Sequence, residues 1–261
     1  MEQSQSALTG AVLFYNKPEP LALETHGALG VNRVDNPYAF VAQTHVVPIT
    51  VTEFAATALS YPIVFVGTET KTPLAVMGLR QGENLYVDAD GKLRPDAYIP
   101  AFVRRYPFVF ANDESQSRMI LCVDRGAAFV SENPDVPFFE DGKPSAYTEQ
   151  AMRFCNDFET ERQRTVSFCK LLQDLDLFES REATFTPRNA DGSPGAPQKI
   201  ADYFAVSEAR LNALPVEKLK ELRDNGALGQ IYAHLTSLLG WDRLIALAVD
   251  RAARQPAAAN A

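Results

Sequence analysis

The chain has 261 residues, 46% of them hydrophobic and 22% charged, so it is long enough to bury a sizeable core as one large domain or two small ones. Its formal net charge of −8 repels phosphate, which argues against a nucleic-acid binder and against electrostatic docking on an anionic membrane. No hydrophobic run approaches the ~20 residues that span a bilayer, and the polar segment 1–10 does not resemble a signal peptide. We therefore expect a cytoplasmic protein without a transmembrane segment.

The character of the sequence changes once, near residue 148. Both ends of the chain are polar or rich in small residues, and we expect 1–8 and 256–261 to be disordered tails. Between them the sequence predicts one domain over 9–255, β-rich over 9–147 and helical over 148–255.

The β-rich part contains short runs of β-branched and aromatic residues separated by polar turns. Segments 62–67, 73–80 and 84–88 predict three strands of an antiparallel meander. The same pattern extends to 107–111 and 118–124, and 38–43 is a candidate for another strand. Two helices interrupt the sheet: 51–59, with Thr50 or Thr52 as its N-cap, and 98–105, closed by Pro107.

The second part shows helical spacing of its hydrophobic residues. One long helix is predicted over 148–175 and a Gly/Pro/Asn-rich loop over 187–197. Shorter helices follow over 208–214, from Pro215 to Asn225-Gly226, and over 227–239 and 241–254. The fold class is therefore α+β, with an antiparallel meander packed against helices and a mainly helical C-terminal third.

Three stretches carry a family resemblance. They are VPITVTEFAATALSYPIVF at 47–65, NLYVD at 84–88 continued by YIPAFVRRYPF at 98–108, and AVSEARLNAL at 205–214 continued by GALGQIYAHLTSL at 226–238. Together they resemble the SapC family of bacterial proteins over nearly the whole chain. Genes of this family often lie near those of TonB-dependent receptors and of halogenase-like and cupin-like proteins, so the resemblance implies an accessory role in nutrient uptake or modification. It supplies no agreed catalytic residues.

The adjacent arginines Arg104 and Arg105, set between Tyr98 and Tyr106, form the most distinctive cluster. Two guanidiniums beside aromatic rings are suited to binding a carboxylate or phosphate. In the alternative interpretation one arginine pairs with an internal acid, Glu53 or Asp88, and the other is solvated. The predicted ligand- or partner-binding residues are Arg104, Arg105, Tyr98, Tyr106, Glu53 and His45.

We predict no metal and no cofactor. His26, His45 and His234 lack the spacing of metal ligands, although folding can still bring His26 and His45 together. The sequence Asp88-Ala-Asp90-Gly91 is typical of a tight turn rather than a calcium loop. The three cysteines, Cys122, Cys155 and Cys169, have hydrophobic neighbours and are expected to be buried thiols in a reducing compartment.

These observations favour a non-enzymatic binding or adaptor protein that has a protein partner in an uptake or modification system. The first alternative is an enzyme, or enzyme subunit, that acts on a peptide or small metabolite at the cluster around Arg104. The second is a surface-layer component, which the family name suggests and which requires export.

Overall fold

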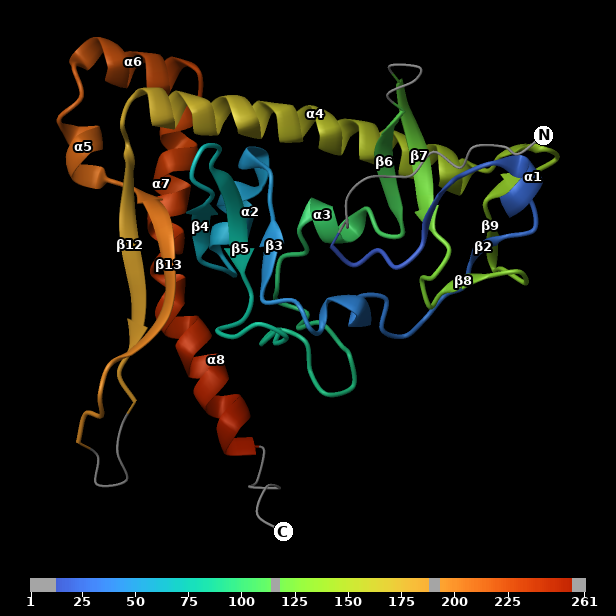
Figure 1. The fold of residues 1–261 in the computed structure, drawn as a ribbon, viewed down its shortest axis with the longest axis horizontal. Coiled ribbons are helices and arrows are strands. Elements are labelled where there is room, and N and C mark those ends of the chain that lie inside the picture. Colours follow the sequence, from blue (N-terminus) through green and yellow to red (C-terminus); the bar gives the residue numbers. More distant parts are fainter. Residues whose placement is uncertain (1–12, 114–117, 188–192, 255–261) are drawn as a thin grey trace.

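The computed structural model describes residues 13–113, 118–187 and 193–254, so the expected tails 1–8 and 256–261 lie outside the described part. It confirms the α+β class. Antiparallel sheets occupy the N-terminal half, and helices dominate the C-terminal region (Figure 1).

The largest sheet has five strands in the order β12-β13-β4-β5-β3, and all neighbours are antiparallel. Its strands are β3 (Val46–Pro48), β4 (Ile63–Val66), β5 (Thr72–Val76), β12 (Phe178–Phe185) and β13 (Gln198–Val206). Strands β4 and β5 confirm the first two strands of the predicted meander. Their β-branched side chains pack well on the pleated surface, and Ile63 and Phe65 are fully buried.

Two predicted strands are wrong. Residues 84–88 form a turn with a single bridge from Val87 to Leu93, and residues Ala39–Val41 form the 3-10 helix η1. The hydrophobic residues at 84–88 are buried in the core although they do not pair as a strand. Tyr86 is fully buried, and its hydroxyl donates to Ser60 O. The side chain of Asn84 donates to Val41 O and accepts from Tyr86 N, which stabilises the turn.

The β12–β13 hairpin is a feature that the sequence patterns missed. It lies in the region predicted to be helical and joins the sheet through one bridge, from Phe204 to Phe65. Along β12 only Ala183 is buried, so the strand lacks the alternation of polar and hydrophobic residues that predicts a strand.

Three smaller sheets lie at the other end of the molecule. Strands β1 (Pro18–Pro20), β7 (Arg118–Asp124) and β6 (Phe108–Asp113) form one; β8 (Val130–Ser131), β2 (Gly30–Val31) and β9 (Val136–Pro137) form the second; β10 (Phe139–Glu140) and β11 (Lys143–Pro144) form the third. Segments 107–111 and 118–124 are thus strands, as predicted, but they do not extend the meander.

The helices are α1 (Leu23–His26), η2 (Val51–Glu53) continued by α2 (Phe54–Ala58), α3 (Ala101–Arg104), α4 (Ala146–Asp174), α5 (Glu208–Asn212), α6 (Val216–Asp224), α7 (Ala227–Ser237) and α8 (Gly240–Arg254). The predicted helices are all present, although the one expected over 98–105 is shorter, and α1 was not predicted. Gly226 ends α6 in the left-handed conformation (φ 78°), as expected for its position after Asn225. Across the described ranges, no helix has the length and hydropathy needed to cross a membrane.

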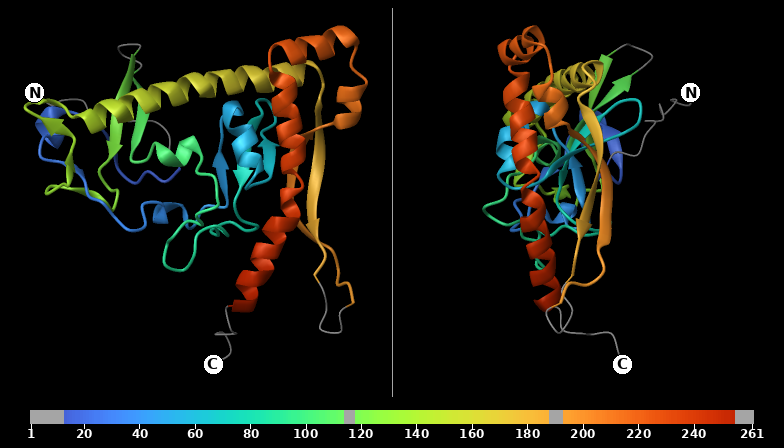
Figure 2. Two further views of the ribbon diagram at one scale, coloured as in Figure 1. Left: turned by 180° about the vertical axis from the view of Figure 1, so that it is seen from behind. Right: turned by 90° about the vertical axis from the view of Figure 1, so that its left-hand side faces the viewer.

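Helix α4 runs along one side of the whole molecule, while α7 packs on one face of the five-stranded sheet (Figures 1 and 2). There are two clusters of buried hydrophobic residues. The large cluster lies between the sheet, α2, α7 and α4 and includes Phe168 and Leu172. The small cluster lies among the smaller sheets and includes Phe108 and Cys155. Because α4 contributes to both clusters, it links the two ends of the fold.

Candidate functional site

Glu53 is the centre of the polar cluster that the sequence predicts. It ends η2 and is buried, with 6% of its surface exposed. Its Oε2 accepts from the backbone N of Thr50 (2.8 Å), which is the Glu53 half of a capping box, and also from the Thr50 hydroxyl (2.8 Å). Its Oε1 accepts from the Tyr98 hydroxyl (2.9 Å) and from Ala101 N (2.6 Å) at the start of α3. The carboxylate therefore connects two helical segments that lie far apart in sequence.

Tyr98 and Arg104 continue this network to the surface. The Tyr98 hydroxyl donates to Glu53, and burial together with that carboxylate raises the pKa of Tyr98 to about 12. Arg104 is exposed; its Nε donates to Ile99 O (3.0 Å), and its Nη2 lies 3.4 Å from the Tyr98 hydroxyl. The guanidinium also lies 5.2 Å from the ring of Phe154. Three contacts therefore hold one exposed arginine in a defined orientation.

Arg105 has a different environment although it is adjacent to Arg104. Its guanidinium carbon lies 4.1 Å from the ring centre of Phe102, 4.6 Å from that of Phe158 and 6.0 Å from that of Tyr15. Its buried Nε–H has no hydrogen-bond acceptor. Burial lowers the pKa of the Arg105 guanidinium, because the charged form loses hydration.

A cavity of about 260 Å³ lies beside Arg105, between α3, α4 and the ends of β3 and β5. Lys71 and Arg162 also line it, and its other walls are Pro48, Ile49, Thr50, Thr70, Thr72, Pro73, Phe102, Phe158, Thr165 and Val166. Hydrophobic walls with a few charged groups are typical of a small-molecule site.

The structure does not place either arginine against Glu53 or Asp88. Glu53 is occupied by Thr50, Tyr98 and Ala101, while Asp88 Oδ1 accepts from the backbone N of Asp90 and Lys92. The sequence 88–91 is therefore the tight turn that was predicted. Solvation of one arginine is confirmed, since Arg104 is exposed.

A comparison with protein-family models decides the classification. The model described as SapC matches residues 21–244, which include both arginines and every residue lining the cavity beside Arg105. The chain belongs to the SapC family. No curated protein and no solved structure matches it significantly.

In this SapC-family protein, Tyr106 and His45 lie outside the Glu53 network. The Tyr106 hydroxyl donates to Asp124 (3.0 Å), a fully buried carboxylate that also accepts from the backbone N of Asn16, Lys17 and Gly126. Burial, with a further contribution from Asp124, raises the pKa of Tyr106. His45 lines a separate cavity of about 300 Å³ beside β3, β4 and β13. The six predicted residues are therefore divided among four places: the Glu53 network, the cavity beside Arg105, the Tyr106–Asp124 pair and the cavity lined by His45.

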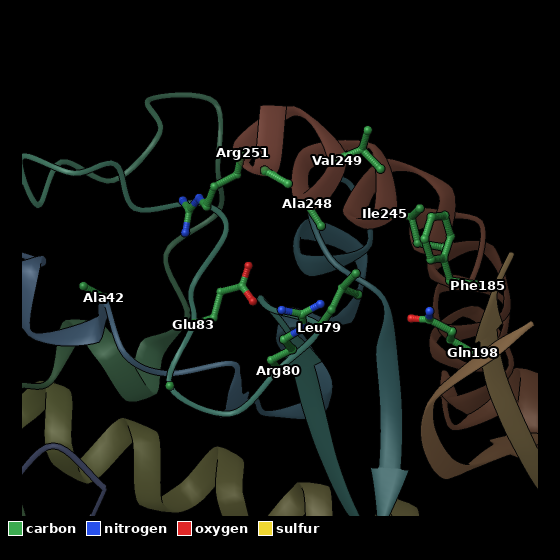
Figure 3. Close-up of a pocket in the computed structure, with 12 residues that line it drawn as sticks. Ala42, Leu79, Arg80, Glu83, Phe185, Gln198, Ile245, Ala248, Val249 and Arg251 are labelled. Atoms are coloured by element: carbon green, nitrogen blue, oxygen red, sulfur yellow. The ribbon is translucent and has the colours of Figure 1, made fainter. Parts of the chain in front are cut away.

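Another cavity, with a volume of about 460 Å³, lies between α8, the loop after β5 and the β12–β13 hairpin (Figure 3). Arg251 projects from α8 toward this loop, and its guanidinium donates to Asn84 O (2.8 Å) and Val87 O (2.6 Å). Its charge is therefore used to fasten α8 to the loop, and none of the predicted site residues lines this cavity.

Within the described residues, no group of three or more His, Cys, Asp and Glu side chains is arranged to hold a metal ion. The cysteines are free and buried, as predicted. Burial raises the pKa of Cys122 and Cys155 to about 11 and that of Cys169 to about 12, so the thiols are poorly ionised near neutral pH.

Sequence reasoning missed Lys71, Arg162 and the two aromatic rings that contact the Arg105 guanidinium. Phe158 and Arg162 are four residues apart on α4, so helical spacing alone places them on one face. Lys71 stands in the polar turn before β5, where a lysine is unremarkable, and no local pattern distinguishes it.

Proposed function

We propose that this SapC-family protein is a non-enzymatic binding or adaptor protein of the cytoplasm, accessory to a bacterial nutrient-uptake or modification system. Its partner-binding surface centres on Arg104. The observation that carries the proposal is the fixed orientation of this exposed guanidinium by Ile99 O, the Tyr98 hydroxyl and the Phe154 ring.

An arginine held in this way is suited to protein recognition. Arginine and tyrosine are enriched among the residues that dominate binding energy, and a side chain ordered before binding loses less conformational entropy. A guanidinium has five N–H donors, so two internal hydrogen bonds leave three for a partner. The expected partner surface carries a carboxylate, because a fork of N–H donors matches its two oxygens.

The burial and the hydrogen bonds of Glu53 support a binding role rather than the enzymatic alternative. A general base needs an oxygen that is accessible to the proton it abstracts. Both oxygens of Glu53 instead accept hydrogen bonds from within the fold, and the carboxylate is buried. Its four bonds are those of a structural carboxylate.

The test is a pull-down of the tagged full-length protein from its native bacterium, with bound proteins identified by mass spectrometry and affinities then measured on the purified pair. We expect a stoichiometric partner whose affinity falls about thirtyfold with Arg104→Ala, the effect of removing about 2 kcal/mol. Arg223→Ala is the matched control, because Arg223 is an exposed arginine on α6 that pairs with Asp224. This control is expected to bind as the wild type does.

The proposal is contradicted if the Arg104→Ala protein, folded by circular dichroism, binds the partner with wild-type affinity. Turnover of a small substrate that is lost with Glu53→Gln supports the enzymatic alternative instead. Recovery of the protein in the cell-surface fraction supports the surface-layer alternative.

A further inference from the structure

Arg105 brings a positive charge to the wall of this cavity in a protein of net charge −8. Three cationic residues line it: Arg105, Lys71 and Arg162. Arg162 is paired, since its Nε and Nη2 lie 2.8 and 2.6 Å from the two oxygens of Glu159. In residues 13–113, 118–187 and 193–254, no carboxylate oxygen lies within 4.0 Å of a charged nitrogen of Arg105 or Lys71.

The charge of Arg105 is costly to keep without a close counter-ion, because Glu159, which pairs with Arg162, attracts it only from a longer distance. Lys71 does not share this role: its ammonium donates to Thr68 O and lies 4.0 Å from the ring centre of Phe204, and neither of these residues lines the cavity. Arg105 is packed among aromatic rings, and its buried Nε–H lacks an acceptor. Aromatic faces offset part of the lost hydration, but they do not supply the missing hydrogen-bond acceptor. An anion that enters the cavity would pair with the terminal N–H groups of this guanidinium and so supply the close counter-ion that it lacks.

The rings also orient the guanidinium. Phe102 and Phe158 lie within 4.6 Å of its carbon, so the stem of Arg105 is confined before any ligand arrives. A guanidinium confined in this way presents a planar fork of N–H groups, which matches the two oxygens of a carboxylate.

We propose that this cavity binds a small carboxylate with a hydrophobic body, whose carboxylate pairs with Arg105 and whose body contacts the hydrophobic walls. The volume of about 260 Å³ lies below the usual range for drug-sized ligands, which limits the ligand to a small acid. A carboxylate fits better than a phosphate monoester, because one guanidinium among Phe, Pro and Val side chains matches the single charge of a carboxylate and does not replace the hydration that a dianion loses. The site is separate from the surface around Arg104 and is testable without knowledge of any protein partner.

The experiment is calorimetric titration of the full-length protein with a defined panel. The carboxylate probes are benzoate, phenylacetate and hexanoate, while benzyl alcohol, phenyl phosphate and inorganic phosphate serve as comparisons. We expect at least one carboxylate to bind about tenfold or more tightly than benzyl alcohol, which lacks the charge, and more tightly than phenyl phosphate. Binding of none of the three carboxylates, or stronger binding of either phosphate, overturns the proposal.

Three variants locate the site. Arg105→Met keeps an unbranched hydrophobic stem without the charge and is expected to weaken carboxylate binding about tenfold to a hundredfold. Val166→Trp fills the cavity from an exposed position of α4 and is expected to abolish binding with the core intact. Arg164→Met, an exposed arginine of α4 that does not line the cavity and pairs with Glu161, is the matched control and is expected to bind normally.

Wild-type affinity in Val166→Trp overturns the proposal even if Arg105→Met does not fold. The same conclusion follows if a folded Arg105→Met protein binds the carboxylate with unchanged affinity.

Discussion

At the scale of single residues, one buried carboxylate organises much of the candidate site. Glu53 caps its own helix through Thr50 and fixes the start of α3 through Ala101, 48 positions along the chain. It also holds the Tyr98 hydroxyl, which in turn contacts Arg104. The orientation of the exposed arginine therefore depends on an acid that does not touch it.

This dependence gives a prediction for Glu53→Gln. The amide keeps one carbonyl acceptor but turns an NH2 group toward donors that a carboxylate oxygen had satisfied, so buried donors lose their acceptors. We expect the free energy of unfolding in urea to fall by roughly 2–3 kcal/mol. Glu161→Gln, at a half-buried acid of α4 that pairs with the exposed Arg164, is the control and is expected to change stability by less than about 1 kcal/mol. An unchanged urea midpoint in Glu53→Gln contradicts the assigned role.

The sequence indicated the arginine pair because its setting among tyrosines and prolines is unusual, and Arg104, Tyr98 and Glu53 do lie together. It also led us to place Tyr106 and His45 there, and the structure separates both from the group. Proximity in sequence cannot show which way adjacent side chains point. Arg104 faces solvent and Arg105 faces a cavity, because successive positions of a helix differ by about 100°.

At the scale of elements, His234 connects α7 to two strands of the large sheet. It is fully buried, its Nε2 accepts from Val206 N of β13 (3.0 Å), and its Nδ1 lies 3.0 Å from Ile63 O of β4. Since Nε2 is the acceptor, Nδ1 carries the proton and donates to Ile63, and the ring is neutral. Burial lowers the pKa of His234 to about 4.

Stability therefore depends on pH through this residue. The unfolded chain protonates His234 near its ordinary pKa of 6.5, whereas the fold resists protonation until about pH 4. The stabilisation is complete above pH 6.5 and is lost as the pH falls toward 4, by roughly 3 kcal/mol in total. Urea unfolding of the wild type and of His234→Gln at pH 7.5, 6 and 4.5 measures how the free energy of unfolding of each protein depends on pH. We expect the wild type to lose stability more steeply than the variant, and parallel losses in the two proteins would contradict the prediction.

Among the elements, helices were easier to predict than strands. A helix depends on local spacing and caps, so the segments from 148–175 to 241–254 were located from their own residues. The β12–β13 hairpin was missed because β12 lacks alternating buried and exposed residues, and its place beside β4 depends on a contact between residues more than 130 positions apart. At residues 84–88 the error was the reverse, because a strand was predicted where none forms. The hydrophobic residues there are explained by the burial of Tyr86 rather than by strand pairing.

At the scale of the whole molecule, α4 connects the two clusters of buried hydrophobic residues, and this connection bears on whether they unfold together. The two clusters of buried hydrophobic residues contain different parts of this helix, with Cys155 in the small cluster and Cys169 in the large one. The 29-residue helix is continuous from Ala146 to Asp174. If one cluster unfolds, the shared helix loses packing that the other cluster needs, so we propose a single cooperative unit.

Two single-cysteine proteins test this proposal. In each, Cys122 and one α4 cysteine are replaced by Ala, which leaves Cys155 or Cys169 as the reporter. Both thiols are buried in the native state, and burial raises the pKa of each, so a thiol reagent modifies them only after unfolding. Pulsed labelling across a urea series is expected to give, for each reporter, a labelling midpoint that coincides with the unfolding midpoint of the same protein by circular dichroism. Labelling of Cys155 at urea concentrations where the helical signal of that protein is still largely native would show that the smaller sheets open independently of the rest, and the chain would then consist of two units connected by α4.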